Sequence, residues 1–323
     1  TNAPHGPYHC PEKYWKPYLA QGLTERQAIF FGMIANIDEN VGALRHWLRN
    51  KGLEKDTIFI FTTDNGTASG REIFNAQMRG QKGSEYEGGH RVPFFLSWPS
   101  GGLNNARDID QLTAHVDILP TFIDLCGLKA PMDYAFDGRS LVSLLYDLPV
   151  PWSDRALVTD SQRVIDPIKW RKSAVMTEQW RLVNGKELYH INRDPSQKNN
   201  LAAKRPRVVE TLRHEYDKWW DSISPGFAVH ERMVVGNDAE NPAHLTGHDW
   251  LADSDNASPW HQGKIRAAKP SEGGWAIRVE QSATYVISLR RWPRELSHPI
   301  NADLAPGAAV PGLNAFRETP GKG

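Results

Sequence analysis

The feature that most constrains the fold is a long amphipathic helix pattern followed at once by a continuous apolar run. In residues 24–52, apolar side chains recur every three or four positions, which predicts one helix with a single apolar face. These positions are Phe30, Ile34, Ile37, Val41, Leu44 and Leu48. Thr24 and Gln27 have the spacing of a capping box, and Gly52 suits the end of the helix. The run "TIFIFTT" at 57–63 does not alternate, which is typical of a strand buried on both faces of a parallel sheet.

The remaining patterns divide the chain into three parts. Residues 1–150 are expected to form the second half of a doubly wound mixed α/β sheet, because "RVPFFLSWP" predicts another buried strand and "HVDILPTFIDLCG" a helix with Asp117 as N-cap. Residues 151–223 predict a smaller antiparallel α+β domain with a type I′ turn at Asn184-Gly185. Residues 224–323 predict a β-rich C-terminal extension, with an antiparallel pair in "GGWAIRVEQSATYVISLRRWP".

Charge and cysteine content exclude several classes of partner. Lys plus Arg (38) equals Asp plus Glu (38), so no basic excess indicates nucleic-acid binding. The apolar runs are too short for a membrane span. Cys10 and Cys126, the two cysteines of the chain, make neither a disulfide framework nor a metal cluster.

The predicted strand 57–63 ends in Asp64-Asn65-Gly66. Ligands of open α/β sheets gather beyond the carboxyl ends of the strands, and a carboxylate beside an amide carbonyl suits Ca²⁺ or Mg²⁺. The alternative is an Asx turn in which Gly66 supplies a positive φ. Taken alone, the tripeptide favours the turn.

Two further residues could carry chemistry. Lys82 lies in a glycine-flanked loop before the second predicted strand, where a lysine can hold an anionic oxygen or remain a solvated surface residue. His5, between a proline and a glycine, could protonate a leaving group, bind an oxyanion, or only be exposed. Glu87 and Arg91 indicate a structural pair beside a tight turn.

The order of these features resembles the C-terminal part of the formylglycine-dependent sulfatases of the alkaline phosphatase superfamily. His5 precedes "DNG", Lys82 precedes "EGGHRVP" and "HVDILPT", and "ELYHINRDPSQKNNLA" is similar to the closing-domain signature of that family. The resemblance covers roughly the first two thirds of the chain. It implies that Asp64 and Asn65 bind a divalent cation, usually Ca²⁺ with Mg²⁺ as the alternative. It also implies that Lys82 contacts the sulfate and bridging oxygen, and that His5 contacts the sulfate or leaving group and helps protonate it.

The nucleophile motif of that family, Cys-x-Pro-Ser-Arg or its serine version, is absent. Cys10 is followed by "PEKY" and Cys126 by "GLKA", and the family's early metal-binding aspartates and second Lys/His pair are also missing. The resemblance therefore implies a C-terminal portion whose formylglycine lies upstream of Thr1, and the chain alone is expected to be inactive.

The resemblance implies hydrolysis of an aryl or carbohydrate sulfate, since Asp-Asn rather than Asp-His favours sulfate esters. The partner would be a sulfated small molecule or carbohydrate, and the location periplasmic or extracellular, as for bacterial relatives. One alternative is a phosphodiesterase or phosphonate monoester hydrolase of the same superfamily. Another is a non-catalytic module that binds sulfated glycans or other anions.

The C-terminal extension offers one more candidate. Trp260 and His261 lie in an irregular, polar stretch, where Trp could stack on a sugar ring and His meet a sulfate, or both could be structural. Trp275 and Trp292 are expected to fill a small core.

Overall fold

The structure, a computed structural model, describes residues 1–130, 134–162, 164, 166–229, 231–252, 259 and 262–307. It contains two compact units. Unit 1 comprises Thr1–Glu39, Arg163–Pro167 and Ile223–Gly323, and unit 2 comprises Asn40–Gln162 and Ile168–Ser222.

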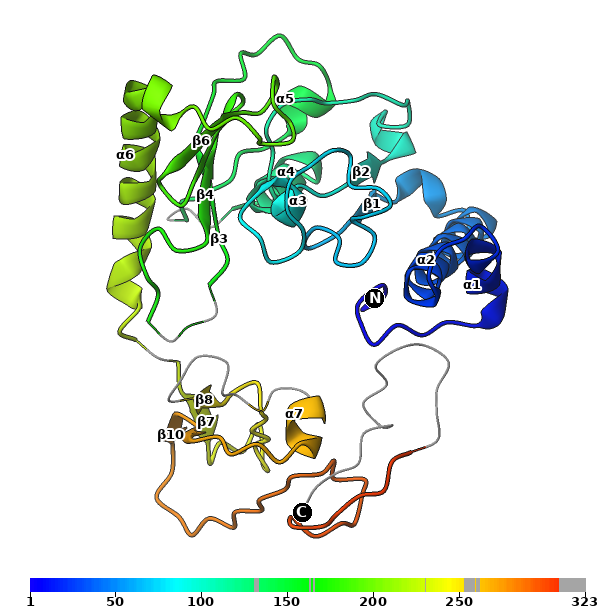
Figure 1. Ribbon diagram of the computed structural model, residues 1–323, viewed down its shortest axis with the longest axis vertical. Coiled ribbons are helices and arrows are strands. Elements are labelled where there is room, and N and C mark those ends of the chain that lie inside the picture. The colour runs from blue at the N-terminus through cyan, green and yellow to red at the C-terminus, as the bar shows by residue number, and fades with distance from the viewer. Residues whose placement is uncertain are drawn as a thin grey trace. The chain divides into compact units, whose positions relative to one another are not determined.

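Figure 1 shows the order of the elements along the chain. The α-helices are α1 (Glu12–Leu19), α2 (Glu25–Asn50), α3 (Glu87–His90), α4 (Ile118–Leu125), α5 (Val142–Leu145), α6 (Pro206–Ile223) and α7 (Gln262–Arg266). The strands are β1 (Phe59–Thr62), β2 (Phe94–Ser97), β3 (Leu157–Asp160), β4 (Ser173–Met176), β5 (Trp180–Val183), β6 (Glu187–His190), β7 (Met233–Val235), β8 (Leu251–Ala252), β9 (Gly273–Gly274) and β10 (Ile277–Val279). The 3-10 turns are η1 (Glu54–Asp56), η2 (Pro99–Gly101), η3 (His115–Asp117), η4 (Ala202–Lys204) and η5 (Ser224–Gly226). None of the helices in the described part of the chain combines the length and apolarity that crossing a bilayer requires.

Helix α2 begins with the predicted capping box. The Thr24 amide donates to Gln27 Oε1 at 3.1 Å, and the Gln27 amide donates to Thr24 Oγ1 at 3.4 Å. Gly52, at φ 70°, follows the helix end as predicted. The predicted apolar face is only partly buried: Phe30 is 5% exposed, whereas Leu44 is 48% exposed. Periodicity specifies which face is apolar, but other elements decide whether that face is covered.

Within unit 1, residues preceding α1 and both helices enclose a small core. Phe30 packs there with Tyr8, whose ring meets it edge-on at 5.7 Å between centroids. The other buried members are Cys10, Trp15, Ala28, Ile29 and Met33.

Strands β1 and β2 pair antiparallel, with Phe59 opposite Ser97 and Thr62 opposite Phe94. The expectation of a parallel neighbour is therefore wrong for this pair. Phe95 of β2 is 66% exposed, so the ladder is also not buried on both faces within this chain. A run of apolar residues indicates that a strand tends to be buried, but it does not determine whether the neighbouring strand runs parallel or antiparallel.

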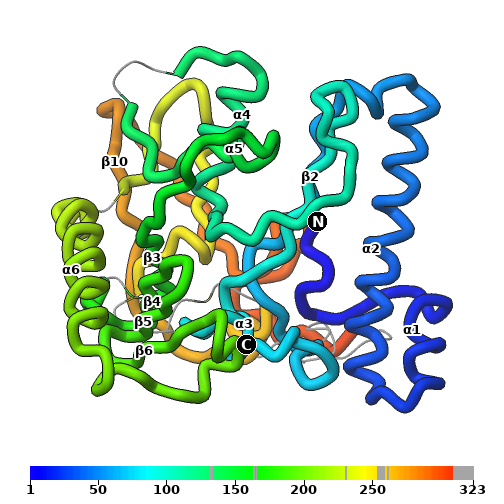
Figure 2. The backbone as a smooth tube through the Cα atoms, turned by 90° about the horizontal axis from the view of Figure 1, so that it is seen from above, coloured from blue at the N-terminus to red at the C-terminus, as the bar shows by residue number. Residues whose placement is uncertain are grey.

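Unit 2 also holds the predicted antiparallel sheet, in the order β3-β4-β5-β6 (Figure 2). Asn184 (φ 51°) and Gly185 (φ 65°) confirm the tight turn between β5 and β6. Helix α6 runs along one face of this sheet (Figure 1), and the two meet in a core where Tyr216 is fully buried. The other buried members are Val175, Leu182, Leu188, Val209 and Leu212, and each buried aliphatic side chain contributes about 1.5–3 kcal/mol.

The strands of the C-terminal extension are short. The predicted antiparallel pair within 273–293 is wrong, because β10 pairs parallel with β7 and β9 pairs antiparallel with β8. Trp292 is buried, at 4% exposed, as expected. Trp275 packs edge-on against Trp250 at 4.6 Å and donates from Nε1 to the Thr246 carbonyl at 2.8 Å. Trp260 and His261 lie outside the described residues.

Candidate active site

The turn that follows β1 presents Asp64 and Asn65 side by side. Asp64 is exposed and Asn65 is half-buried. Asn65 Nδ2 donates to Asp64 Oδ2 at 2.6 Å, and Thr63 Oγ1 donates to the Asn65 carbonyl at 3.1 Å. The segment is therefore a compact polar turn at the end of β1, in which the amide nitrogen of Asn65 faces the carboxylate of Asp64.

Gly66 has a different role from the one its sequence context predicts. Its backbone does not have the positive φ expected of a turn glycine. Instead, its amide donates to the Gly89 carbonyl at 3.0 Å, and a Cβ at this position would overlap the Gly88 carbonyl. Glycine is required here because the loop ahead of β2 approaches the turn at backbone contact distance.

That approaching loop carries Lys82. The Lys82 amide donates to the Thr67 carbonyl at 3.0 Å, so a second backbone hydrogen bond joins the loop to the strand-end turn. Gly80 (φ 86°) and Gly83 (φ 81°) allow the chain to double back around it. In the described part of the chain, no carboxylate lies within ion-pair distance of Lys82. The structure thus joins the loop that carries Lys82 to the turn that carries Asp64 and Asn65 through backbone hydrogen bonds.

His115 also reaches this turn, although its position in the sequence did not make it a candidate site residue. Its Nε2 lies 3.1 Å from the Thr63 carbonyl oxygen. His115 opens η3, which ends at the buried Asp117. The sequence signal for it is its place at the start of "HVDILPT", a motif of the family resemblance, just ahead of the helix that Asp117 predicts.

Asp117 occupies the N-cap position of α4, but its carboxylate does not cap that helix. It forms a buried ion pair with Arg155, and it accepts hydrogen bonds from the Ala114 and Arg139 amides at 2.8 Å each. Burial acts to raise the pKa of Asp117, and the hydrogen bonds from Arg155 and these amides outweigh it, so the pKa lies below its ordinary value. The charged pair fixes η3 and, with it, His115.

Glu87 lies at the end of the Lys82 loop and is buried. The predicted pair with Arg91 exists at 3.8 Å, but the closer partner is Arg181 of β5, whose Nε donates to Glu87 Oε1. Burial and the nearby Arg181 charge lower the pKa of His90, which follows in α3, and neutral imidazole is favoured there.

His5 lies in unit 1, whereas Asp64, Asn65 and Lys82 lie in unit 2. The structure describes only the immediate surroundings of His5. Its side chain is exposed, and its Nδ1 lies 2.7 Å from the Gly6 carbonyl oxygen.

The donor chemistry of Asp64 and Asn65 fits a hard cation, as part of a larger shell. Each offers a side-chain oxygen of the type that Ca²⁺ and Mg²⁺ prefer, and Ca²⁺ takes about six to eight such ligands. Within the described residues, no group of three or more His, Cys, Asp or Glu side chains could hold a metal ion. These two residues therefore supply a minority of the ligands that such an ion needs.

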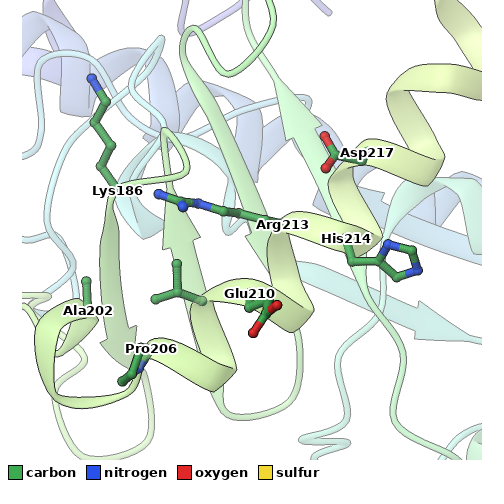
Figure 3. A pocket seen from close by; sticks show the side chains of 8 residues that line it. Lys186, Ala202, Pro206, Glu210, Arg213, His214 and Asp217 are labelled. Atoms are coloured by element: carbon green, nitrogen blue, oxygen red, sulfur yellow. The ribbon is translucent and has the colours of Figure 1, made fainter.

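A separate groove of 610 Å³ lies along α6 and does not include the strand-end turn (Figure 3). Its lining residues are Lys186, Ala202, Pro206, Val209, Glu210, Arg213, His214 and Asp217. Arg213 donates from Nε to the Gly185 carbonyl at 2.9 Å, and Asp217 pairs with Lys169 at 2.7 Å. Because the lining carries both signs of charge, the groove does not favour an anion over a cation.

Comparison with known proteins covers the first two thirds of the chain. Residues 1–128 match the family described as Sulfatase, and residues 81–219 match the family described as N-sulphoglucosamine sulphohydrolase, C-terminal. The second match spans both the Lys82 loop and the β3–β6 sheet.

Individual relatives match a similar share of the chain. The uncharacterized sulfatase YdeN of Escherichia coli (strain K12) is 26% identical over 262 residues, 69% of this chain and 46% of the relative. The steryl-sulfatase of Mus musculus is 34% identical over 256 residues, 68% of this chain and 40% of the relative. An arylsulfatase of Clostridium perfringens (strain 13 / Type A) is 28% identical over 235 residues, covering 70% and 46%. The chain thus spans less than half the length of these relatives.

Solved structures confirm the α/β fold class. The crystal structure of Ps i-CgsB in complex with k-i-k-neocarrahexaose superposes with a TM-score of 0.60 at 25% sequence identity, covering 67% of this chain and 48% of that chain. A second crystal structure of Ps i-CgsB gives a TM-score of 0.61 at 24% identity, covering 68% and 48%.

Proposed function

The chain belongs to the sulfatase family, and from that premise we propose that it is the C-terminal part of an enzyme that hydrolyses sulfate esters. One observation carries the proposal. Backbone hydrogen bonds from Gly66 to Gly89 and from Lys82 to Thr67 hold the Asp64-Asn65 turn against the Lys82 loop. A divalent cation held by the oxygens of this turn, together with a lysine on the adjoining loop, would form a site for a tetrahedral oxyanion.

Each residue has a distinct task in this proposal. Asp64 and Asn65 hold part of the shell of a divalent cation, Ca²⁺ in the first instance, which when bound stabilises negative charge on the sulfuryl oxygens. The Lys82 ammonium group binds a sulfate oxygen and balances charge on the bridging oxygen as its bond breaks. His5 protonates the leaving alcohol. The formylglycine nucleophile belongs to sequence upstream of Thr1, so the chain alone does not turn over substrate.

A sulfated carbohydrate is the proposed substrate class. Two relatives are named N-acetylgalactosamine-6-O-sulfatase and Endo-4-O-sulfatase, both of Bacteroides thetaiotaomicron, at 29% and 27% identity. The Ps i-CgsB structure contains a neocarrahexaose. A periplasmic or extracellular location follows as part of the same proposal, since polymeric sulfated glycans are met outside the cytoplasm.

The test is made in the protein that includes the region upstream of Thr1. Asp64→Ala should lose divalent-cation binding together with aryl sulfate hydrolysis, and Lys82→Met should lower kcat/KM for the aryl sulfate about a hundredfold or more. Asp56→Ala, at an exposed position of η1, is the matched control and should retain activity. Calorimetric titration with Ca²⁺ and an initial-rate assay give the two readouts.

Three outcomes would contradict the proposal. Wild-type activity in Asp64→Ala would show that Asp64 only stabilises the turn and binds no catalytic cation. A coding region upstream of Thr1 without a Cys/Ser-x-Pro-x-Arg motif would instead favour a non-catalytic anion-binding module. Faster hydrolysis of phosphonate monoesters or phosphodiesters than of sulfate esters would identify the enzyme as a phosphonate monoester hydrolase or phosphodiesterase instead.

A further inference from the structure

The loop that carries Lys82 is anchored at both ends on the antiparallel sheet of unit 2. Arg79 begins this loop and Glu87 ends it. Their partners come from β5, β6 and the Asp194–Gln197 turn, which are separated from the loop by about a hundred residues of sequence. These contacts therefore connect the β3–β6 sheet to the loop of the proposed oxyanion site.

At the far end of the loop, Glu87 is held by two groups. Its carboxylate accepts a hydrogen bond from Nε of Arg181. Arg181 is itself buried, and its guanidinium also donates to the Thr177 and Trp180 carbonyls. Its backbone amide donates to Oε1 of Gln197 at 2.9 Å. Both contacts are buried, where a hydrogen bond left unmade costs most.

At the near end, Arg79 reaches the same turn. Its guanidinium donates to the Gln197 carbonyl at 3.0 Å and to the Tyr189 hydroxyl at 2.9 Å. A third bond of 3.0 Å goes to the Tyr86 hydroxyl, and the guanidinium carbon lies 3.9 Å from the centre of the Tyr86 ring. Glu187 accepts from both tyrosine hydroxyls, so the cation, the two phenols and the carboxylate form one connected network.

Gln197 is the residue that both ends share. It is fully buried and has a positive φ of 48°, in a turn whose Asp194 carboxylate accepts the Lys198 and Asn199 amides at 3.1 and 2.8 Å. Its side chain binds Glu87 and its backbone carbonyl binds Arg79, so it closes the base of the loop.

We propose that Gln197 is a positioning residue for Lys82, acting through Glu87 and Arg79 on the loop that holds the lysine against the Asp64-Asn65 turn. The inference rests on the proposed role of Lys82 as a sulfate ligand. It assigns to the β3–β6 sheet a task beyond packing. In this proposal the sheet sets the distance between the Lys82 ammonium group and the side-chain oxygens of Asp64 and Asn65. A lysine on a loosened loop would bind the anion more weakly, because binding would first have to order the loop.

The test substitutes Gln197→Met, which keeps the side-chain length and removes the acceptor for the Glu87 amide. Tyr216→Phe is the matched control: it removes hydroxyl contacts to Asp160 and the Trp170 amide in the same sheet–helix core, away from the loop. In the chain as it stands, hydrogen exchange at the Lys82 and Gly66 amides should become about tenfold faster in Gln197→Met. Tyr216→Phe should leave exchange at these two amides within about twofold of the wild type.

A second readout is affinity for inorganic sulfate, measured by titration of the same chain. Gln197→Met should weaken sulfate binding about tenfold, and Lys82→Met should abolish it. Unchanged exchange in Gln197→Met, equal acceleration in both variants, or unchanged sulfate affinity would overturn the positioning role. If the wild-type chain binds no sulfate while Gln197→Met still frees the Lys82 and Gly66 amides selectively, the positioning stands and the proposed anion site fails.

Discussion

At the residue scale, Gly66 shows how a turn and a site can share one sequence. The Asp-Asn-Gly tripeptide is what a strand-ending turn requires, and the structure contains that turn. The glycine is nevertheless needed for a tertiary reason, since its missing side chain makes room for the Gly88 carbonyl. A glycine needed only for a positive φ would say nothing about which segment packs against it. Gly66 is needed because the Gly88 carbonyl packs there.

Gly66→Ala is therefore expected to separate the turn from the Lys82 loop. The added Cβ overlaps backbone atoms, which cannot move aside as a flexible side chain would, so the free energy of unfolding should fall by about 1–3 kcal/mol. Gly42→Ala is the control, because a Cβ there meets open space on α2 and should raise stability by about 0.5–1 kcal/mol. Urea unfolding measures both changes, and equal effects of the two variants would contradict the close-approach argument.

At the scale of elements, η3 and α4 are fixed to the fold by one buried charge pair. Asp117 is fully buried, and Arg155 reaches it from just ahead of β3. Thr121 donates to the Asp117 carbonyl at 2.6 Å and accepts from the Leu141 amide at 2.9 Å, which ties α4 to the start of α5. Asp117 thus connects the segment ahead of β3 through its carboxylate and helix α4 through its backbone carbonyl, and His115, two residues earlier, contacts the strand-end turn.

Asp117→Asn should cost about 3 kcal/mol or more of unfolding free energy at neutral pH, because it leaves the Arg155 charge buried without a counter-charge. The pKa of Asp117 is lowered on folding, so its contribution is complete above the unfolded value of about 3.9 and is lost as pH falls through the folded value. The stability difference between wild type and variant should therefore shrink in acid. Urea unfolding at neutral pH and at about pH 3 gives the comparison, and a constant difference would exclude the charge pair as its source.

At the scale of the whole molecule, several aromatic side chains are largely exposed. Phe74 is 75% exposed and Phe95 66%, both in the segment between β1 and the end of β2. The chain also matches less than half the length of its sulfatase relatives. Exposed aromatic groups on this scale favour association with other apolar surfaces.

Phe74→Ser should accordingly lower the fluorescence of a bound apolar dye and reduce self-association, with little change in stability because the side chain is already in water. Phe30→Ser, at a buried position of the unit 1 core, should lower the free energy of unfolding by about 3 kcal/mol or more. Analytical ultracentrifugation and dye titration measure association and exposed apolar surface. Undiminished association in Phe74→Ser would assign the exposed apolar surface to other residues.

Much of the local structure could be predicted from the sequence. The capping box of α2, the Asn184-Gly185 turn, the helix α6 and the polar end of β1 all depend on residues within about four positions of one another. The resemblance to the sulfatases also came from the sequence, through the combined order of His5, Asp64-Asn65-Gly66, Lys82 before "EGGHRVP", "HVDILPT" and "ELYHINRDPSQKNNLA".

The sequence by itself therefore determined the elements and the residue types of the candidate site, whereas the tertiary structure decided their partners. The direction of β2 against β1, the Arg155 partner of Asp117 and the two bonds of Gln197 involve residues that lie far apart along the chain. The physical reason is that periodicity and capping signals act within a turn or two of backbone. A buried hydrogen bond between distant residues leaves no such local pattern, and packing alone selects its partner.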